Sequence, residues 1–125
     1  HIGIMPQSVR GKFKYKGKTN TEKNKLLKDS KLLEEAGVFA IVLECIERKL
    51  SKEITDSINI PTIGIGSSNF CDGQIMVTDD LLGLTDTKIK FVKKYADLKG
   101  SVKNAVKKFK LEVKKGSYPS IKYSY

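Results

Sequence analysis

Histidine, cysteine, arginine and long apolar runs are all scarce in this 125-residue sequence, and each scarcity argues against a class of protein. No apolar stretch approaches the roughly 20 residues that a membrane-spanning helix needs. The first residues show no basic region followed by an apolar one, as a secretory signal would. A single histidine, His1, leaves a zinc site without ligands. We therefore expect one soluble, cytoplasmic domain with a core of modest size and no membrane partner.

The two cysteines, Cys45 and Cys71, lack the short spacing of a metal or redox site. They stand at the ends of two different expected strands. Both are interpreted as reduced packing residues, in keeping with a cytoplasmic compartment, and a disulfide between them is the alternative.

Arginine is nearly absent although the formal net charge is +10, from 22 lysines and 2 arginines against 14 acidic residues. Arginine recognises phosphates and guanine bases through the paired donors of its planar guanidinium group. In addition, the aromatic residues do not alternate with the lysines, as a surface that stacks bases would require. We interpret the lysines, concentrated from Lys88 to Lys115, as a solvated surface and expect no nucleic-acid partner. A basic binding module is the competing hypothesis, and little DNA binding at low salt would exclude it.

The first third of the chain predicts a helix and then a strand. The letters TNTE at 19–22 form a capping box, apolar or small residues follow at helical spacing, and Gly37 supplies the stop. The run Val38 to Leu43 is continuous and branched, which is typical of a parallel strand covered on both faces.

The same rhythm then repeats. The spacing of Leu50, Ile54 and Ile58 predicts a second amphipathic helix. After it we expect a strand over 60–66, a loop over 67–73, a third strand over 74–78 and a helical tail at about 88–116. This alternation predicts an α/β protein with a parallel sheet. A doubly wound sheet or a (β/α) barrel fits the spacing, but neither closes with three or four strands, so the chain looks like half of a barrel.

Polar residues follow each expected strand, at the edge where such folds carry their function. They are Glu44 after the first strand, residues 64–68 (GIGSS) after the second and residues 79–80 after the third, while His1 and Gln7 follow a strand that is expected to precede residue 1. We expect these groups to face one cavity. The GIGSS stretch matches neither common phosphate-binding pattern, and a tight turn explains it equally well.

Glu44 ends the apolar run AIVLEC, where an unpaired charge is costly to bury. A carboxylate in a water-poor strand end can have its pKa raised and serve as a general base. The competing interpretation is an exposed acid that pairs with a lysine.

Seven ordered motifs decide between these interpretations: HIGIMPQSV, GKT, LEEAGVFAIVLECI, IPTIGIG, CDGQIMV, DLLGL and KFVKKYADL. Together they resemble the ketopantoate hydroxymethyltransferase family, and they span nearly the whole chain. The resemblance implies a (β/α)8 TIM barrel in which residues 1–125 are the carboxyl-terminal half of a single domain. It implies an amino-terminal half as partner and a homo-oligomer, a pentamer of dimers.

The resemblance also implies an activity. The family transfers a hydroxymethyl group from 5,10-methylenetetrahydrofolate to 3-methyl-2-oxobutanoate, giving 2-dehydropantoate for pantothenate and coenzyme A synthesis, with the help of Mg²⁺. Its general base falls on Glu44, and the resemblance implies that His1, from its HxGxxPQ motif, is a supporting residue in the cavity. Ser67 is a further supporting candidate, because it is expected near the same cavity. Its magnesium ligands lie in the amino-terminal half, so no metal ligand is expected in this chain.

The chain departs from the family at several positions. Met5 stands where threonine is usual, Ser67-Ser68 replace a common Ala-Gly, and Asp79 takes a frequent histidine position. Another barrel enzyme of the phosphoenolpyruvate and pyruvate type, such as an isocitrate-lyase-like enzyme of C–C bonds, is the alternative, since such folds host many chemistries.

Overall fold

The computed structural model describes residues 1–5 and 14–125, which form two units, residues 1–76 and residues 77–125. The first unit is an α/β arrangement with a parallel sheet, as the alternation of elements predicts. Its elements are β1 (Ile2–Gly3), α1 (Asn20–Glu35), β2 (Ile41–Glu44), α2 (Arg48–Ser57), β3 (Thr62–Ile65) and β4 (Gly73–Gln74). The strand order in the described sheet is β1-β2-β3-β4, with every neighbouring pair parallel.

Helix α1 begins and ends where the capping residues predict. The Thr19 hydroxyl accepts a hydrogen bond from the Glu22 amide at 3.2 Å. The Glu22 carboxylate accepts from the amides of Gly17 and Lys18, upstream of the cap. At the other end Gly37 has a φ of 82°, and its amide donates to the Glu34 carbonyl, which satisfies the last turn.

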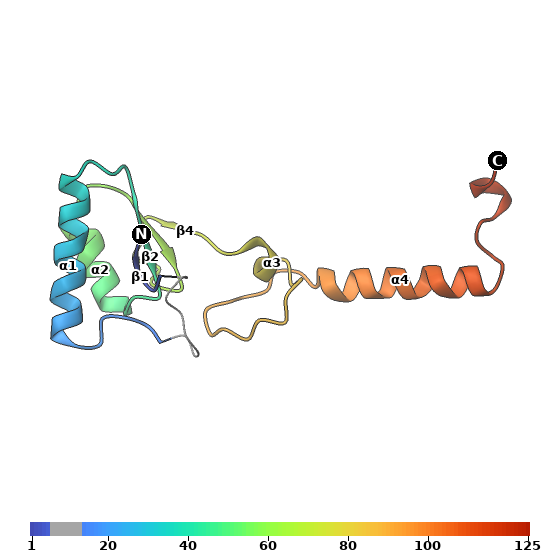
Figure 1. The fold of residues 1–125 in the computed structure, drawn as a ribbon, viewed down its shortest axis with the longest axis horizontal. Helices are drawn as coiled ribbons and strands as arrows, with labels where there is room; N and C mark the ends of the chain where they lie inside the picture. The colour runs from blue at the N-terminus through green and yellow to red at the C-terminus, as the bar shows by residue number, and fades with distance from the viewer. Residues whose placement is uncertain (6–13) are drawn as a thin grey trace. The chain divides into compact units, whose positions relative to one another are not determined.

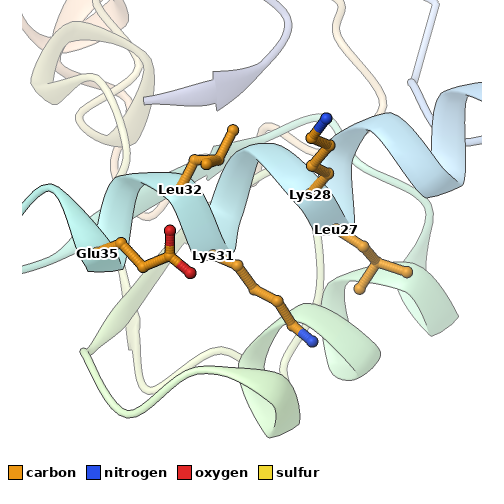
Figure 2. A pocket seen from close by; sticks show the side chains of 5 residues that line it. All are labelled: Leu27, Lys28, Lys31, Leu32 and Glu35. Carbon is orange, nitrogen blue, oxygen red and sulfur yellow. The ribbon is translucent and has the colours of Figure 1, made fainter.

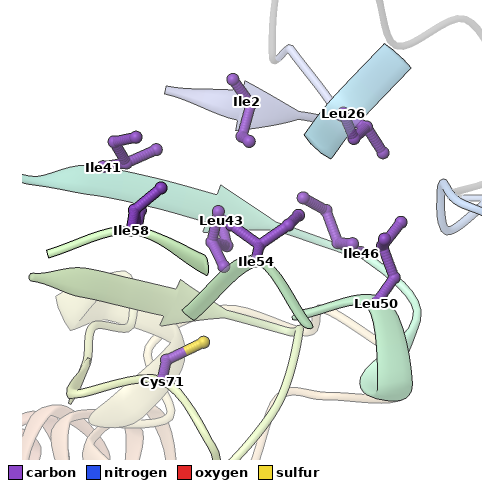
Figure 3. Packing of buried hydrophobic residues seen from close by; sticks show 9 residues of the cluster. All are labelled: Ile2, Leu26, Ile41, Leu43, Ile46, Leu50, Ile54, Ile58 and Cys71. Atoms are coloured by element: carbon purple, nitrogen blue, oxygen red, sulfur yellow. The ribbon is translucent and has the colours of Figure 1, made fainter. Parts of the chain in front are cut away.

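The core of the first unit lies between the sheet and its two helices. Helices α1 and α2 lie side by side on one face of the sheet (Figure 1). Apolar side chains of the strands and of α2 meet there (Figure 3). The cluster consists of Ile2, Leu26, Ile41, Leu43, Ile46, Leu50, Ile54, Ile58 and Cys71. Cys45 is also buried, and both cysteines are free thiols.

Strand β2 differs from the expectation that both of its faces are covered. Along it, and also along β3, buried and half-buried residues alternate. Ile41 and Leu43 are fully buried on the helical side, whereas Val42 and Glu44 are half-buried on the other. The reason is that the described helices of this unit lie on one face, so the second face carries no matching layer in residues 1–5 and 14–76.

The third strand is shorter than the expected 74–78. Only Gly73 and Gln74 pair with β3, opposite Ile63 and Gly64. Met76 and Val77 are outside any strand, and α3 (Thr78–Leu81) begins directly afterwards.

The regular structure of the second unit is helical. It consists of α3, α4 (Leu98–Lys114) and a short 3-10 helix, η2 (Ile121–Tyr123). Helix α4 starts at its N-cap Asp97, whose carboxylate accepts from the Gly100 amide at 2.9 Å, so it occupies the later part of the tail expected at 88–116. Its apolar stripe is exposed, including Val106 and Phe109 at 60% and 54%. No helix among the described residues is long and apolar enough to cross a membrane.

Candidate active site

Glu44 is the last residue of β2 and lies at the carboxyl edge of the sheet. Because side chains alternate along a strand, Glu44 shares the half-buried face with Val42, opposite the face that packs on the helices. Its side chain is only 12% exposed. The strand therefore places a nearly buried carboxylate on the sheet face that no described helix of this unit covers.

His1 is the partner of this carboxylate. The register aligns Gly3 of β1 with Glu44 of β2, and His1, two residues before Gly3, falls on the same face. Its Nε2 lies 3.0 Å from Glu44 Oε2, and its side chain is 31% exposed. The structure thus brings together two of the residues that the sequence analysis placed at one edge.

Burial sets the electrostatics of the site. Removal from water raises the pKa of the Glu44 carboxyl above its usual range. The same burial, with the negative charge of Glu44 next to it, raises the pKa of the Cys45 thiol. A carboxylate with a raised pKa is a stronger proton acceptor once ionised, which is what a general base requires. The neighbouring thiol, in contrast, is kept protonated and is a poor nucleophile.

The chain turns sharply directly after the carboxylate. Cys45 has a φ of 51°, in the left-handed region that is uncommon for a residue with a side chain. The neighbouring strands hold this turn, because the Glu44 carbonyl accepts from the Ile4 amide and the Cys45 amide donates to the Ile65 carbonyl, each at 2.9 Å. Nothing in the sequence pattern indicated this conformation.

Ser67 lies against the same turn. Its hydroxyl donates to the Leu43 carbonyl at 2.6 Å and accepts from the Ile46 amide at 3.1 Å. Both partners are more than twenty positions away in the chain. The position of Ser67 after an expected strand predicts this edge of the sheet, but the two contacts depend on tertiary packing.

Asp72 anchors the loop that follows Ser67. Its Oδ2 accepts from the Thr62 amide at 2.8 Å and from the Thr62 hydroxyl at 3.0 Å. Thr62 is fully buried at the start of β3. These hydrogen bonds lower the pKa of the Asp72 carboxyl, and the residue has the turn role that its type favours.

The remaining candidates are placed elsewhere. Gln7 lies outside the described residues. Asp79 and Asp80 belong to α3 of the second unit, where buried Asp80 accepts a hydrogen bond from the Thr85 hydroxyl, so their place beside Glu44 stays a prediction. Among residues 1–5 and 14–125, no group of three or more histidine, cysteine or acidic side chains could hold a metal ion.

A shallow depression of about 410 Å³ lies on the surface of α1 (Figure 2). Its walls are side chains of that one helix: Leu27, Lys28, Lys31, Leu32 and Glu35. It includes neither Glu44 nor any other residue at the carboxyl edge of the sheet. The candidate chemistry is therefore at the strand ends and not in this depression.

Comparison with known proteins identifies the family. A family model described as ketopantoate hydroxymethyltransferase matches residues 1–121. The chain belongs to this family. The 3-methyl-2-oxobutanoate hydroxymethyltransferase of Pelagibacter ubique (strain HTCC1062) is 52% identical over 125 residues, which is 100% of this chain and 48% of the relative.

Two further relatives carry the same name. The Clostridium botulinum (strain Loch Maree / Type A3) protein is 51% identical over 128 residues, and the Caulobacter vibrioides (strain NA1000 / CB15N) protein is 46% identical over 127 residues. Each match covers 100% of this chain and 46% of the relative. The chain thus spans about half the length of the curated relatives it matches. The family resemblance of its motifs is confirmed, and the isocitrate-lyase-like alternative is not favoured.

Proposed function

We propose that the protein carrying this chain transfers a hydroxymethyl group to 3-methyl-2-oxobutanoate and forms 2-dehydropantoate, in pantothenate biosynthesis. The observation that carries this proposal is the nearly buried Glu44 at the carboxyl end of β2, 3.0 Å from His1. It occurs in a chain that is about half identical to enzymes named for this reaction. The proposed one-carbon donor is 5,10-methylenetetrahydrofolate.

The sheet supports a barrel as the setting for this site. Four parallel strands present one face to α1 and α2, and the opposite face is half-buried and partly apolar, with Val42, Ile63 and Ile65 on it. In a (β/α)8 barrel, helices cover the outer face, the inner face is packed by the other strands, and the active site lies at the carboxyl ends. We infer that residues 1–76 supply part of such a barrel and that Val42 and Glu44 face its interior.

Glu44 is the proposed general base. The C3 hydrogen of the substrate is acidified by the neighbouring keto group, so Glu44 can take it as a proton while the electron pair remains as an enolate. Water releases the one-carbon unit from 5,10-methylenetetrahydrofolate at the oxidation level of formaldehyde, which breaks its two C–N bonds and leaves tetrahydrofolate. The enolate carbon then forms a bond to this carbon, and the resulting alkoxide takes a proton back from Glu44 to become the hydroxyl of the product. His1 is the proposed supporting residue, because its ring nitrogen contacts Glu44 Oε2 and fixes the orientation of the carboxylate.

Among the residues that the structure describes, no group of three or more histidine, cysteine or acidic side chains could hold a metal ion, so none of these residues is proposed as a magnesium ligand. Mg²⁺ ligands on an amino-terminal half, and assembly as a pentamer of dimers, stay predictions from the family resemblance.

The substitution Glu44→Gln in the complete enzyme tests the base. It keeps the shape of the side chain and one acceptor oxygen, but it replaces the other oxygen by an NH2 donor and removes the ability to take a proton. We expect exchange of the C3 proton of 3-methyl-2-oxobutanoate with deuterated water, followed by NMR without folate, to slow by about 10²–10⁴-fold. Substrate affinity should change much less.

The matched control is Glu53→Gln, the same substitution at an exposed position of α2. It should exchange the C3 proton at the wild-type rate. Wild-type exchange in Glu44→Gln with hydroxymethyl transfer lost would show that another group is the base and that Glu44 acts in a later step.

A further inference from the structure

The Ser67 hydroxyl bridges the two ends of the turn that carries Glu44, here called the Glu44 turn (residues 43–46). It donates to the Leu43 carbonyl and accepts from the Ile46 amide. These two groups flank Glu44 and Cys45 on either side. One hydroxyl therefore connects the two ends of the turn through hydrogen bonds.

The Glu44 turn needs such a restraint because its backbone is in an unfavourable conformation. A φ of 51° at Cys45 is the one positive value at a non-glycine residue in the described parts of the chain. Strained residues of this kind persist only where the surroundings hold them. The pairing with β1 and β3 holds the middle of the turn through Glu44 and Cys45, and the Ser67 side chain holds its two flanks.

These contacts use the donor of the hydroxyl and one of its two acceptor positions. Its hydrogen goes to the Leu43 carbonyl, and it accepts the hydrogen of the Ile46 amide. A serine that acted as a nucleophile would instead give its proton to a neighbouring base, and its partners here are backbone groups. The geometry therefore favours a role that Ser67 exerts through the backbone of Glu44.

We propose that Ser67 is a positioning residue that holds the Glu44 carboxylate in place for proton abstraction. This inference rests on the proposed function and adds a residue to it. A base must lie within hydrogen-bonding reach of the proton it removes, and a misplacement of about 1 Å can cost a large part of the rate. The Glu44 side chain leaves the backbone between the two points that Ser67 fixes.

The test is Ser67→Ala in the complete enzyme, read in two ways. We expect kcat for C3 proton exchange to fall about tenfold with KM changed by less than about twofold, because the base is displaced while the substrate still binds. We also expect the amide hydrogen of Ile46 to exchange with solvent deuterium about five to ten times faster, because the hydroxyl that accepts its hydrogen bond is gone.

The control is Ser68→Ala, which removes the adjacent hydroxyl. Ser68 is buried in the same loop, and its side chain accepts from the Phe70 amide at 3.1 Å without bonding to the Glu44 turn. This variant should keep the wild-type rate of exchange of the Ile46 amide hydrogen. Ile46 exchange as fast as in Ser67→Ala would overturn the proposal, because the loop as a whole would then be responsible.

Three other results would also overturn it. The first is that kcat and KM of Ser67→Ala are both unchanged. The second is a raised KM with an unchanged kcat, which would indicate a substrate contact. The third is a failure of Ser67→Ala to fold. If the wild-type enzyme showed no C3 exchange, the proposed function would fail instead. Faster Ile46 exchange in Ser67→Ala would then still support the restraint of the turn, and unchanged exchange would exclude it.

Discussion

At Glu44, the proposed general base, stability and the proposed function oppose each other. Burial raises its pKa, so the folded state favours the protonated form more than the unfolded state does. The stability that the protonated Glu44 carboxyl contributes is complete at pH values below its pKa in the unfolded state. It is lost as the pH rises through its pKa in the folded state. The proposed base, which must be ionised to act, therefore costs the fold some stability at neutral pH.

The pH dependence of unfolding tests this opposition. Glutamine is neutral at every pH, so between about pH 4 and pH 7 we expect the melting temperature of wild type to decrease relative to that of Glu44→Gln. Thermal melts of the complete protein across this range measure the difference. A wild type that gains stability relative to the variant as the pH rises would mean that the contact with His1 outweighs the desolvation of Glu44.

Gly3 controls the approach of β1 to the Glu44 turn. It has a φ of 102°, and a Cβ at this position would lie 2.1 Å from the Glu44 carbonyl oxygen and 2.9 Å from Ile46 Cγ1. We expect Gly3→Ala to cost about 3 kcal/mol or more and to lower C3 exchange, because the backbone that carries the base must shift. Urea unfolding and the exchange assay measure the two effects.

Gly37 offers a matched comparison for Gly3. Its φ is 82°, but a Cβ would meet nothing within 4 Å. Gly37→Ala should therefore show only the cost of a left-handed backbone with a side chain, about 1–2 kcal/mol, and no loss of exchange. Equal effects of the two substitutions would mean that conformation alone, and not contact with Glu44, makes Gly3 necessary.

At the scale of elements, helix α1 depends on its first turn. The Thr19 hydroxyl accepts a hydrogen bond from the Glu22 amide. The Glu22 carboxylate accepts from the amides of Lys18 and Gly17, and these bonds lower its pKa and fix the chain that enters the helix. We expect Thr19→Ala to reduce the free energy of unfolding by about 1 kcal/mol. Thr21→Ala, an exposed position of the same turn, should change it by less than about 0.5 kcal/mol. Denaturant unfolding of the two variants measures the difference, and equal losses would exclude the cap as the cause.

Local signals explain which elements could be predicted from the sequence. The capping box at Thr19 and the stop at Gly37 act within one turn of helix, so both ends of α1 follow from neighbouring residues. The third strand is shorter than predicted. Its apolar residues suggest a strand over 74–78, whereas pairing is limited to the two residues of β4 that lie opposite β3. The side of the sheet that stays half-buried could not be predicted, because a continuous apolar run indicates no face.

The candidate site, too, could be predicted from the sequence only in part. Glu44 and the edge where it lies follow from a strand pattern and the rule that parallel strands end together. The contact with His1 depends on the register of β1 against β2, and the bridge by Ser67 depends on packing across more than twenty positions. Sequence patterns identify the residue types at such an edge, but distances between residues far apart in the chain come from tertiary structure.

At the scale of the whole molecule, the described sheet has an open edge on each side. In residues 1–5 and 14–125, β1 and β4 each pair with one neighbour only, and unpaired edges invite association with other chains. A barrel closes such edges with about eight strands. Under the half-barrel proposal, the missing pairing partners lie on an amino-terminal half.

Two polypeptides that together make up the complete enzyme would test this half-barrel directly. We expect residues 1–125 alone to melt without a cooperative transition and to show no C3 exchange, because the apolar face around Val42 and both sheet edges lack partners. Mixing or co-expression with the amino-terminal polypeptide should restore exchange, and the same mixture made with Glu44→Gln should stay about 10²–10⁴-fold slower. A cooperative melt with full activity from residues 1–125 alone would contradict the proposal, because the four described strands would then not need the other half to close the site.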